Sequence, residues 1–271
     1  MDYVNELFGL EGKRVAITGG GGVLAGAMAE ALLLAGASVA LWGIRIASVE
    51  RAIDRLTAAG VAAGRVIGVE CDAMSAESVR DAIDETFERI GGFDVLINAV
   101  GGNRGKSSFM DADIEVFESV IRLNLVAGLM VPTQEVAKMW IAKGQPGAII
   151  NLASMASFIP LSGVWAYGAA KAAVVNLTIA AAKEFAPEKI RVDAIAPGFF
   201  LGAQNKALLV DEVTGELTPR GSAVLDHTPM ERFGDASEIA GATLFLASER
   251  AAGFVSGITL PIDGGYLTHN I

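Results

Sequence analysis

The 271-residue sequence has almost no cysteine and almost no histidine. Its one cysteine, Cys71, excludes a disulfide within the chain, which fits a reducing compartment. Its two histidines, His227 and His269, argue against a metal site built on several histidine ligands and restrict any Ser-His-Asp triad to one of these two. We therefore expect no metal ion. The N-terminal residues lack a basic segment followed by an apolar one, so we expect no signal peptide and a cytoplasmic protein.

Basic residues are also scarce. The chain has 21 Lys and Arg against 31 Asp and Glu, which gives a net charge of −10 and an isoelectric point near 4.8. Attraction to phosphate needs clustered Lys and Arg, so nucleic acid is not an expected partner.

The sequence lacks an uninterrupted apolar run long enough for a membrane span. Residues 147–170 carry no charge, but Asn151, Ser154, Pro160, Ser162 and several glycines interrupt them. Burying those polar groups in lipid costs several kcal/mol in total. The pattern is typical of a buried strand, a loop and a helix start, and we expect no membrane partner.

What the chain does contain is a regular alternation of short β-branched runs and longer Ala/Leu-rich runs. The expected strands lie at residues 14–18, 38–42, 65–70, 94–97, 148–152, 190–195 and 259–262. The expected helices lie at 25–36, 48–59, 75–90, 114–143 with a break near Pro132, 166–185 and 235–247. This alternation predicts right-handed crossovers and one α/β domain over residues 1–271, a doubly wound Rossmann-type parallel sheet of seven strands with helices on both faces. Residues 198–233 break the rhythm, and we expect them to form a substrate loop region.

A glycine-rich turn, Thr18-Gly-Gly-Gly-Gly-Val-Leu-Ala-Gly26, lies between the first strand and the first helix. Glycines let the backbone approach a pyrophosphate, and a helix N-terminus offers free N–H groups to it. In this position the turn predicts a dinucleotide site formed by Gly19, Gly21, Gly22, Val23 and Leu24. The alternative is a purely structural turn.

Two further patterns concern catalysis. Tyr167 and Lys171 share one helix face, where a lysine cation could stabilise a tyrosinate, although such a pair is more often a surface contact. Ser154 follows a strand, at the edge of a parallel sheet where ligands bind, although a loop hydroxyl usually bonds nearby backbone.

These features occur together in a fixed order. The order is the glycine turn, Asp72, Asn98-Ala-Val-Gly101, Asn124, Ser154, Tyr167, Lys171, Pro197-Gly198 and Asp263-Gly264-Gly265. In this combination the whole chain resembles the short-chain dehydrogenase/reductase family.

The resemblance implies a role for each residue. Tyr167 is the general acid/base, Ser154 hydrogen-bonds the substrate oxygen, and Lys171 lowers the tyrosine pKa and holds the nicotinamide ribose. Asn124 anchors a water in a proton relay. The implied cofactor-binding residues are Gly19, Gly21, Gly22, Val23, Leu24, Arg45, Asp72, Ala73, Asn98, Ala99, Gly101, Tyr167, Lys171, Pro197, Gly198 and Phe200. Alternatively, Asp72 caps the next helix, and Asn98 and Asn124 satisfy buried backbone groups.

The sequence departs from the family pattern in the cofactor region. Val23 and Ala25 stand where the family usually has glycine, and Gly202 replaces a frequent threonine that contacts the cofactor amide. Gly43 occupies the position of the acid that selects NAD, with Arg45 close by. An acid there repels a 2′-phosphate, so its absence favours NADP over NAD.

A narrower pattern combines TGGGGVLAGAMA, GGN at 101–103, APGFFL with Gln204 and Asn205, GELTPRG at 215–221 and HTPMERFG at 227–234. In this combination the chain resembles the D-mannonate oxidoreductase (fructuronate reductase) branch, which implies a sugar-acid or polyol substrate and a homotetramer. The candidate substrate residues are Asn103, Arg104, Lys106, Gln204, Asn205 and Arg220. Two other functions stay open: a dehydrogenase of another ketone or hydroxy substrate, such as a 3-oxoacyl, gluconate-like or steroid-like one, and a non-catalytic dinucleotide-binding regulator.

Overall fold

A computed structural model describes residues 2–202, 209–211 and 214–268 of the chain. Seven parallel strands form one sheet in the order β3-β2-β1-β4-β5-β6-β7. The strands are β1 (Arg14–Thr18), β2 (Ser38–Gly43), β3 (Val66–Glu70), β4 (Val95–Asn98), β5 (Gly147–Leu152), β6 (Ile190–Pro197) and β7 (Thr259–Ile262). The predicted doubly wound sheet is therefore confirmed, and strand order reverses between β1 and β4, where such sheets bind ligands.

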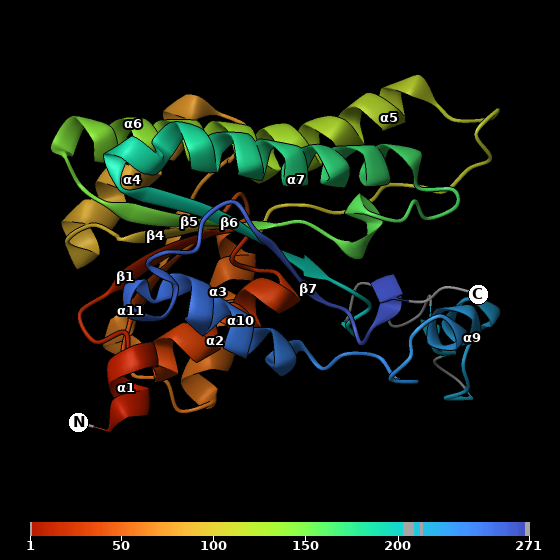
Figure 1. Ribbon diagram of the computed structural model, residues 1–271, viewed down its shortest axis with the longest axis horizontal. Coiled ribbons are helices and arrows are strands. Elements are labelled where there is room, and N and C mark those ends of the chain that lie inside the picture. Colours follow the sequence, from red (N-terminus) through yellow and green to blue (C-terminus); the bar gives the residue numbers. More distant parts are fainter. Residues whose placement is uncertain (1, 203–208, 212–213, 269–271) are drawn as a thin grey trace.

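Helices cover both faces of the sheet (Figure 1). One layer holds α4 (Ala76–Ile90), α5 (Ile114–Ile121), α6 (Val131–Lys143) and α7 (Trp165–Phe185). The other holds α2 (Val23–Leu34), α3 (Ile46–Ala58) and α10 (Ala240–Ala247). Alternate residues of β1 enter the two cores: Val15 and Ile17 pack with α2, and Ala16 packs with the α4 and α6 side.

Three short helices were not predicted. They are α1 (Tyr3–Phe8), α9 (Pro219–Asp226) and α11 (Glu249–Ala252). Helix α9 lies within the expected loop region (Figure 1). The Thr218-Pro219 pair is a sequence signal for the start of this helix. In the structure the Thr218 hydroxyl accepts from Gly221 N at 3.0 Å, and Pro219 is the first residue of the helix.

The expected helix 114–143 is continuous but not uniform. The predicted break near Pro132 is wrong, because the chain stays helical through Met130 and Val131 into α6, of which Pro132 is the second residue. The irregularity comes earlier: Arg122–Met130 is a π-helical stretch that joins α5 to α6. The expected helix 235–247 begins as a 3-10 turn, Ala236–Ile239, with a capping box between Asp235 and Glu238.

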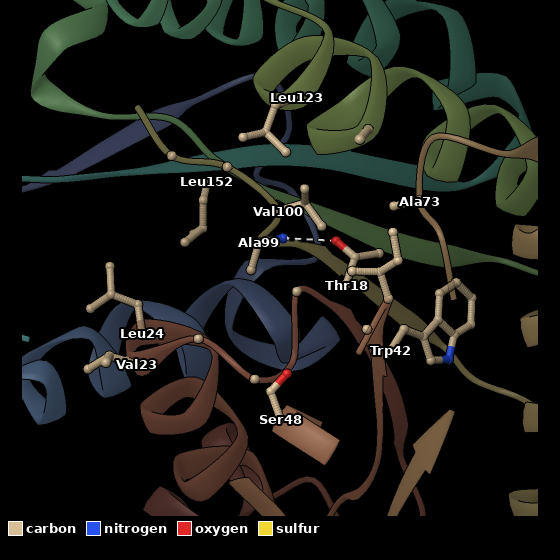
Figure 2. Close-up of a pocket in the computed structure, with 18 of the residues that line it drawn as sticks. Thr18, Val23, Leu24, Trp42, Ser48, Ala73, Ala99, Val100, Leu123 and Leu152 are labelled. Atoms are coloured by element: carbon tan, nitrogen blue, oxygen red, sulfur yellow. Dashed lines mark hydrogen bonds between the residues drawn. The ribbon is translucent and has the colours of Figure 1, made fainter. Parts of the chain in front are cut away.

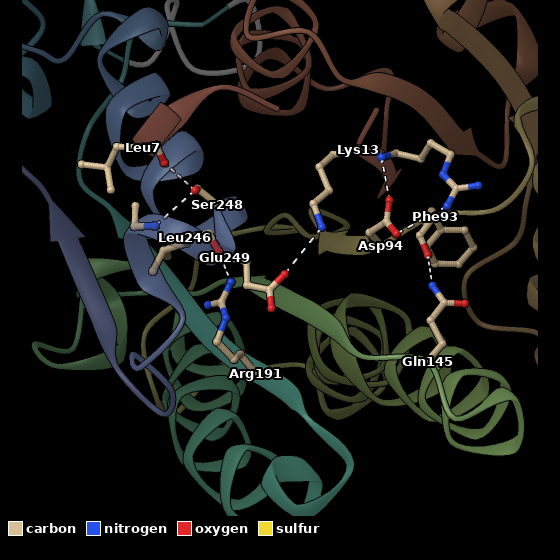
Figure 3. Close-up of polar contacts among 11 residues, drawn as sticks. Leu7, Lys13, Phe93, Asp94, Gln145, Arg191, Leu246, Ser248 and Glu249 are labelled. Atoms are coloured by element: carbon tan, nitrogen blue, oxygen red, sulfur yellow. Dashed lines mark hydrogen bonds and ion pairs between the residues drawn. The ribbon is translucent and has the colours of Figure 1, made fainter. Parts of the chain in front are cut away.

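Polar contacts join loops and strands near the amino ends of the strands (Figure 3). Arg14 N donates to Asp94 Oδ2 at 2.9 Å, and Arg191 Nη2 donates to the Leu246 carbonyl at 2.7 Å. Burial raises the pKa of Asp193, which also forms an ion pair with Arg191 at 3.2 Å. No helix among the described residues combines the length and apolar character that a membrane span requires.

Candidate active site

A cleft of about 680 Å³ lies at the carboxyl ends of the strands, between the two helix layers (Figure 2). In the close-up, Val23 and Leu24 approach it from one side and Leu123 from the other. The cleft brings together most of the predicted site residues: Gly19, Gly21, Gly22, Val23, Leu24, Arg45, Asp72, Ala73, Ala99, Gly101, Arg104, Ser154, Tyr167, Lys171, Pro197, Gly198 and Phe200.

The glycine turn is shaped for close approach to a ligand. Gly19 has φ +66°, and a Cβ there would lie 2.9 Å from the Ala99 carbonyl oxygen, so a larger residue is excluded. Gly22 is the N-cap of α2 and offers no side-chain cap, so the first N–H groups of this helix have no side-chain acceptor. Because Gly22, Val23 and Leu24 line the cleft, this N-terminus fits the pyrophosphate of a dinucleotide.

The end of β2 forms the other part of this region. Gly43 and the exposed Arg45 line the cleft, and the Ser48 hydroxyl donates to the Arg45 carbonyl at 2.8 Å. Asp72 is the one acid among the described lining residues. Its carboxylate accepts from Met74 N at 2.9 Å, while Ser75 caps α4. Asp72 therefore lines the cleft without capping that helix.

Ser154 and Tyr167 meet in the cleft. Ser154 follows β5 and is 5 % exposed, and its hydroxyl accepts from Ala156 N at 3.1 Å. Burial raises the pKa of Tyr167, and a hydrogen bond with the Ser154 side chain acts in the opposite direction. This pair can place a phenol proton and a hydroxyl next to one substrate oxygen.

Lys171 lies one helical turn after Tyr167. Its ammonium donates to the Leu152 carbonyl at 2.7 Å and lies 5.8 Å from the centre of the Tyr167 ring. Burial lowers the pKa of Lys171 to about 8. Burial is the largest influence on the pKa of Tyr167 and raises it. That the Lys171 charge lowers the pKa of Tyr167 stays a prediction.

The two asparagines lie behind the cleft surface. Asn124 is fully buried in the π-helical stretch, where its Oδ1 accepts from Gly102 N at 3.0 Å and its Nδ2 donates to the carbonyls of Gly102 and Val120. It holds the loop after β4, and its water-anchoring role stays a prediction. Asn98 is fully buried too, and its Nδ2 donates to Thr133 and Asn151 at 2.9 Å each.

The structure therefore does not place Asn98 in the cleft lining. It connects β4 to α6 and β5 through side-chain partners, whereas the alternative role was to satisfy buried backbone groups.

The candidate substrate residues separate into groups. Arg104 lines the cleft, whereas Asn103 and Lys106 do not; Asn103 Nδ2 donates to the Gly105 carbonyl at 2.6 Å. Arg220 lies in α9, where its charge acts on Tyr266. Gln204 and Asn205 lie outside the described residues.

Several lining residues were not predicted. They include Thr18, Trp42, Ser48, Cys71, Met74, Leu123 and Leu152. Trp42, Cys71 and Leu152 stand at or just beyond the carboxyl ends of their strands, a position that could have identified them. Burial raises the pKa of the Cys71 thiol to about 12, so it is protonated and not a nucleophile near neutral pH. Among the described residues, no cluster of three His, Cys, Asp or Glu side chains could hold a metal ion.

Known proteins of the oxidoreductase class are similar to this chain over most of its length. The model of a family described as enoyl-(acyl carrier protein) reductase matches residues 22–267. An uncharacterised oxidoreductase of Bacillus subtilis is 38% identical over 275 residues, which cover 96% of this chain and 97% of that protein.

Solved structures share the whole fold. A candidate D-mannonate oxidoreductase from Haemophilus influenza, solved with bound NAD, is 34% identical with a TM-score of 0.88, covering 98% of this chain and 99% of that one. A gluconate 5-dehydrogenase from Burkholderia cenocepacia, solved in complex with NADP and tartrate, is 31% identical with a TM-score of 0.87, covering 99% and 100%.

Proposed function

The chain belongs to the short-chain dehydrogenase/reductase family of NAD(P)-dependent oxidoreductases, and from this premise we propose that it interconverts a secondary alcohol and a ketone on a sugar acid or related polyol. The specific reaction we favour is of the D-mannonate/fructuronate type. One observation carries the proposal: Arg104 lines the same cleft as the hydrogen-bonded Ser154–Tyr167 pair. A guanidinium there offers a bidentate grip on a substrate carboxylate.

The electrostatics of the cleft support an anionic substrate. Its described lining residues carry three cations, Arg45, Arg104 and Lys171, against one acid, Asp72. Arg45 belongs to the cofactor end, beside the turn after β2, and Lys171 lies beside Tyr167. Arg104 is then the cation available to the substrate. The tartrate complex of the gluconate 5-dehydrogenase shows that a relative of this fold was solved with a hydroxy acid.

In the proposed mechanism the bound nicotinamide supplies or accepts the hydride. The glycine turn and the N-terminus of α2 would hold the pyrophosphate of that cofactor, and Lys171 would hold its nicotinamide ribose. Tyr167 gives its phenol proton to the substrate oxygen during reduction and takes it back during oxidation. Ser154 hydrogen-bonds the same oxygen and fixes its position.

The proposal is tested with a panel of hexuronates, aldonates, neutral polyols and unrelated ketones. Turnover is followed by absorbance at the nicotinamide band, with NAD(H) and NADP(H) in parallel. We expect the highest kcat/KM with a sugar acid. Preference for a 3-oxoacyl or steroid substrate would overturn the substrate assignment and keep the family, whereas cofactor binding without turnover of any substrate would indicate a regulator.

The proposed cofactor preference is for NADP(H). Position 43 carries glycine instead of an acid, so no carboxylate there repels the 2′-phosphate of NADP(H). Arg45, which also lines the cleft, offers that phosphate a positive charge. Arg45→Ala is expected to lower kcat/KM for NADP(H) by about tenfold, the value of one charged hydrogen bond, with little change for NAD(H). Steady-state kinetics with both cofactors measures this.

The matched control is Arg51→Ala. Arg51 is an exposed arginine on α3, the helix that begins just after Arg45, and it does not line the cleft. Gly43→Asp should also shift the preference toward NAD(H), but its Cβ would lie 2.7 Å from Val49 Cγ2, so Val49 would have to move. If the unmodified enzyme strongly prefers NAD(H), our interpretation of this loop is wrong.

We also propose that the enzyme is a homotetramer. Large apolar side chains are exposed along α5, α6 and α7, on the layer of helices that Figure 1 shows above the sheet: Ile114 66%, Ile141 41% and Ile179 53%. Such a face favours burial against another copy. Light scattering at micromolar concentration is expected to give four times the chain mass of 28.0 kDa.

Ile179→Glu should shift the enzyme toward smaller species. Leu34→Glu, on the opposite layer and also highly exposed, is the matched control and should leave the mass unchanged. A single 28.0 kDa species for the unmodified chain would contradict the proposal.

A further inference from the structure

The loop that carries Arg104 is attached to the protein on both sides. At one end, Gly102 exchanges two hydrogen bonds with the Asn124 carboxamide. At the other end, Ser107 N donates to the Gly163 carbonyl at 3.2 Å, and the Ser107 carbonyl accepts from Trp165 Nε1 at 3.2 Å. Arg104 lies between these anchors, with an exposed side chain that lines the cleft.

Packing reinforces the second anchor. The Trp165 ring meets Phe109 edge-to-face, with ring centres 5.4 Å apart. The stem of Lys106 lies so close to Gly163 that a Cβ there would be 2.5 Å from Lys106 Cγ, and Gly163 itself has φ +79°. The loop is therefore fitted to the segment just before α7.

This second anchor joins the loop to the catalytic helix. Trp165 opens α7 and precedes Tyr167 by two residues. Few residues separate Gly102 from Ser107, so fixing both ends strongly restricts where Arg104 can place its guanidinium relative to the tyrosine.

We propose that Trp165 is a positioning residue that sets substrate specificity: through Ser107 it holds the 102–107 loop so that Arg104 is aligned with the substrate carboxylate. This inference rests on the proposed sugar-acid function. We expect the side chain to act on binding of the acid and not on the proton transfer, because its hydrogen bond is to Ser107 and its ring contact is with Phe109.

Trp165→Phe tests the inference, because it keeps an aromatic ring near Phe109 and removes the indole N–H together with the five-membered part of the ring. We expect KM for the best sugar acid to rise about threefold to tenfold, the loss that one neutral hydrogen bond explains. The kcat value should stay within about twofold and the cofactor KM should not change, since ground-state and transition-state binding are lost equally.

The chain offers a matched control for the same chemical change. Trp140 Nε1 also donates to a backbone carbonyl at 3.2 Å, that of Phe93, but in the core away from the cleft. Trp140→Phe should lower stability and leave KM for the acid unchanged. An equal rise of KM in both variants would overturn the proposal, because it would show a general loss of stability.

A double-mutant cycle tests whether Trp165 acts through Arg104. Added to Arg104→Ala, Trp165→Phe should raise KM no further, because the group it positions is gone. Additive effects on KM, or a fall in kcat at unchanged KM, would contradict the proposal.

Hydrogen exchange gives a readout that needs no substrate. Amides of residues 103–108 should exchange faster in Trp165→Phe than in Trp140→Phe, with α7 itself unchanged. Unchanged exchange in this loop would overturn the inference. If the unmodified enzyme turns over no sugar acid, the proposed function fails first, while faster exchange would still support the role of Trp165 in holding the loop.

Discussion

Tyr167→Phe is expected to lower kcat by at least about 10²-fold, the usual contribution of a positioned general acid, while the cofactor still binds. Reduction of a carbonyl leaves negative charge on its oxygen, which a proton must neutralise. Tyr167 supplies a phenol in the lining of the cleft, hydrogen-bonded to Ser154 and one helical turn from Lys171. Steady-state turnover together with fluorescence titration of the reduced cofactor separates loss of chemistry from loss of binding.

The control for this variant is Tyr266→Phe. Tyr266 is 9% exposed, packs against Phe199 and does not line the cleft, so removing its hydroxyl should leave kcat within severalfold of the unmodified enzyme. Turnover near the unmodified level in Tyr167→Phe would refute the mechanism.

The same residue predicts a dependence on pH. Burial raises the pKa of Tyr167 in the free enzyme, so the phenol is protonated through neutral pH. Reduction needs this proton and should be constant below that pKa. Oxidation needs the deprotonated form, so its kcat/KM should rise with pH toward the raised pKa. Burial also lowers the pKa of Lys171 to about 8, and loss of its charge above that pH should weaken any stabilisation of the tyrosinate.

Much of this arrangement was predictable because local signals coincided. The β-branched runs place all seven strands within a residue or two of their observed ends, since the five central strands are buried almost throughout and the two edge strands, β3 and β7, are only partly exposed. The glycine turn was recognisable because several of its positions admit nothing larger, as Gly19 shows beside Ala99. Parallel strands bring their carboxyl ends to one edge, so Ser154, Tyr167 and the loop after β4 had to meet there.

The roles of the buried asparagines were not predictable in the same way. Asn98 is the last residue of β4, a position from which its side chain could face either a ligand or the core. Its hydrogen-bond partners Thr133 and Asn151 are far away in the sequence, so the sequence did not show which of the two it faces. The π-helical stretch was not predicted either, and its residue Asn124 bonds to Gly102, which lies 22 residues earlier in the chain. The packing of Trp165 against the 102–107 loop was not predictable either, because it joins segments that are far apart in the sequence.

Arg104→Ala is expected to raise KM for a hexuronate or aldonate by about tenfold or more, because a charged hydrogen bond contributes roughly 1.5–3 kcal/mol. The KM of the cofactor should not change, since the glycine turn and Arg45 that hold it lie elsewhere in the cleft. Neutral polyols provide the internal comparison, because they offer Arg104 no carboxylate and should bind equally well to both forms of the enzyme.

Three further variants decide whether position or charge alone matters. Arg104→Lys keeps the charge but loses the planar bidentate grip, so its KM should fall between those of the alanine variant and the unmodified enzyme. Lys106→Met, which keeps an apolar stem beside Gly163, and Arg220→Ala remove cations that do not line the cleft and should have small effects. If neutral polyols turn over as well as sugar acids, and Arg104→Ala does not change KM, the sugar-acid substrate is wrong and only the dehydrogenase assignment stands.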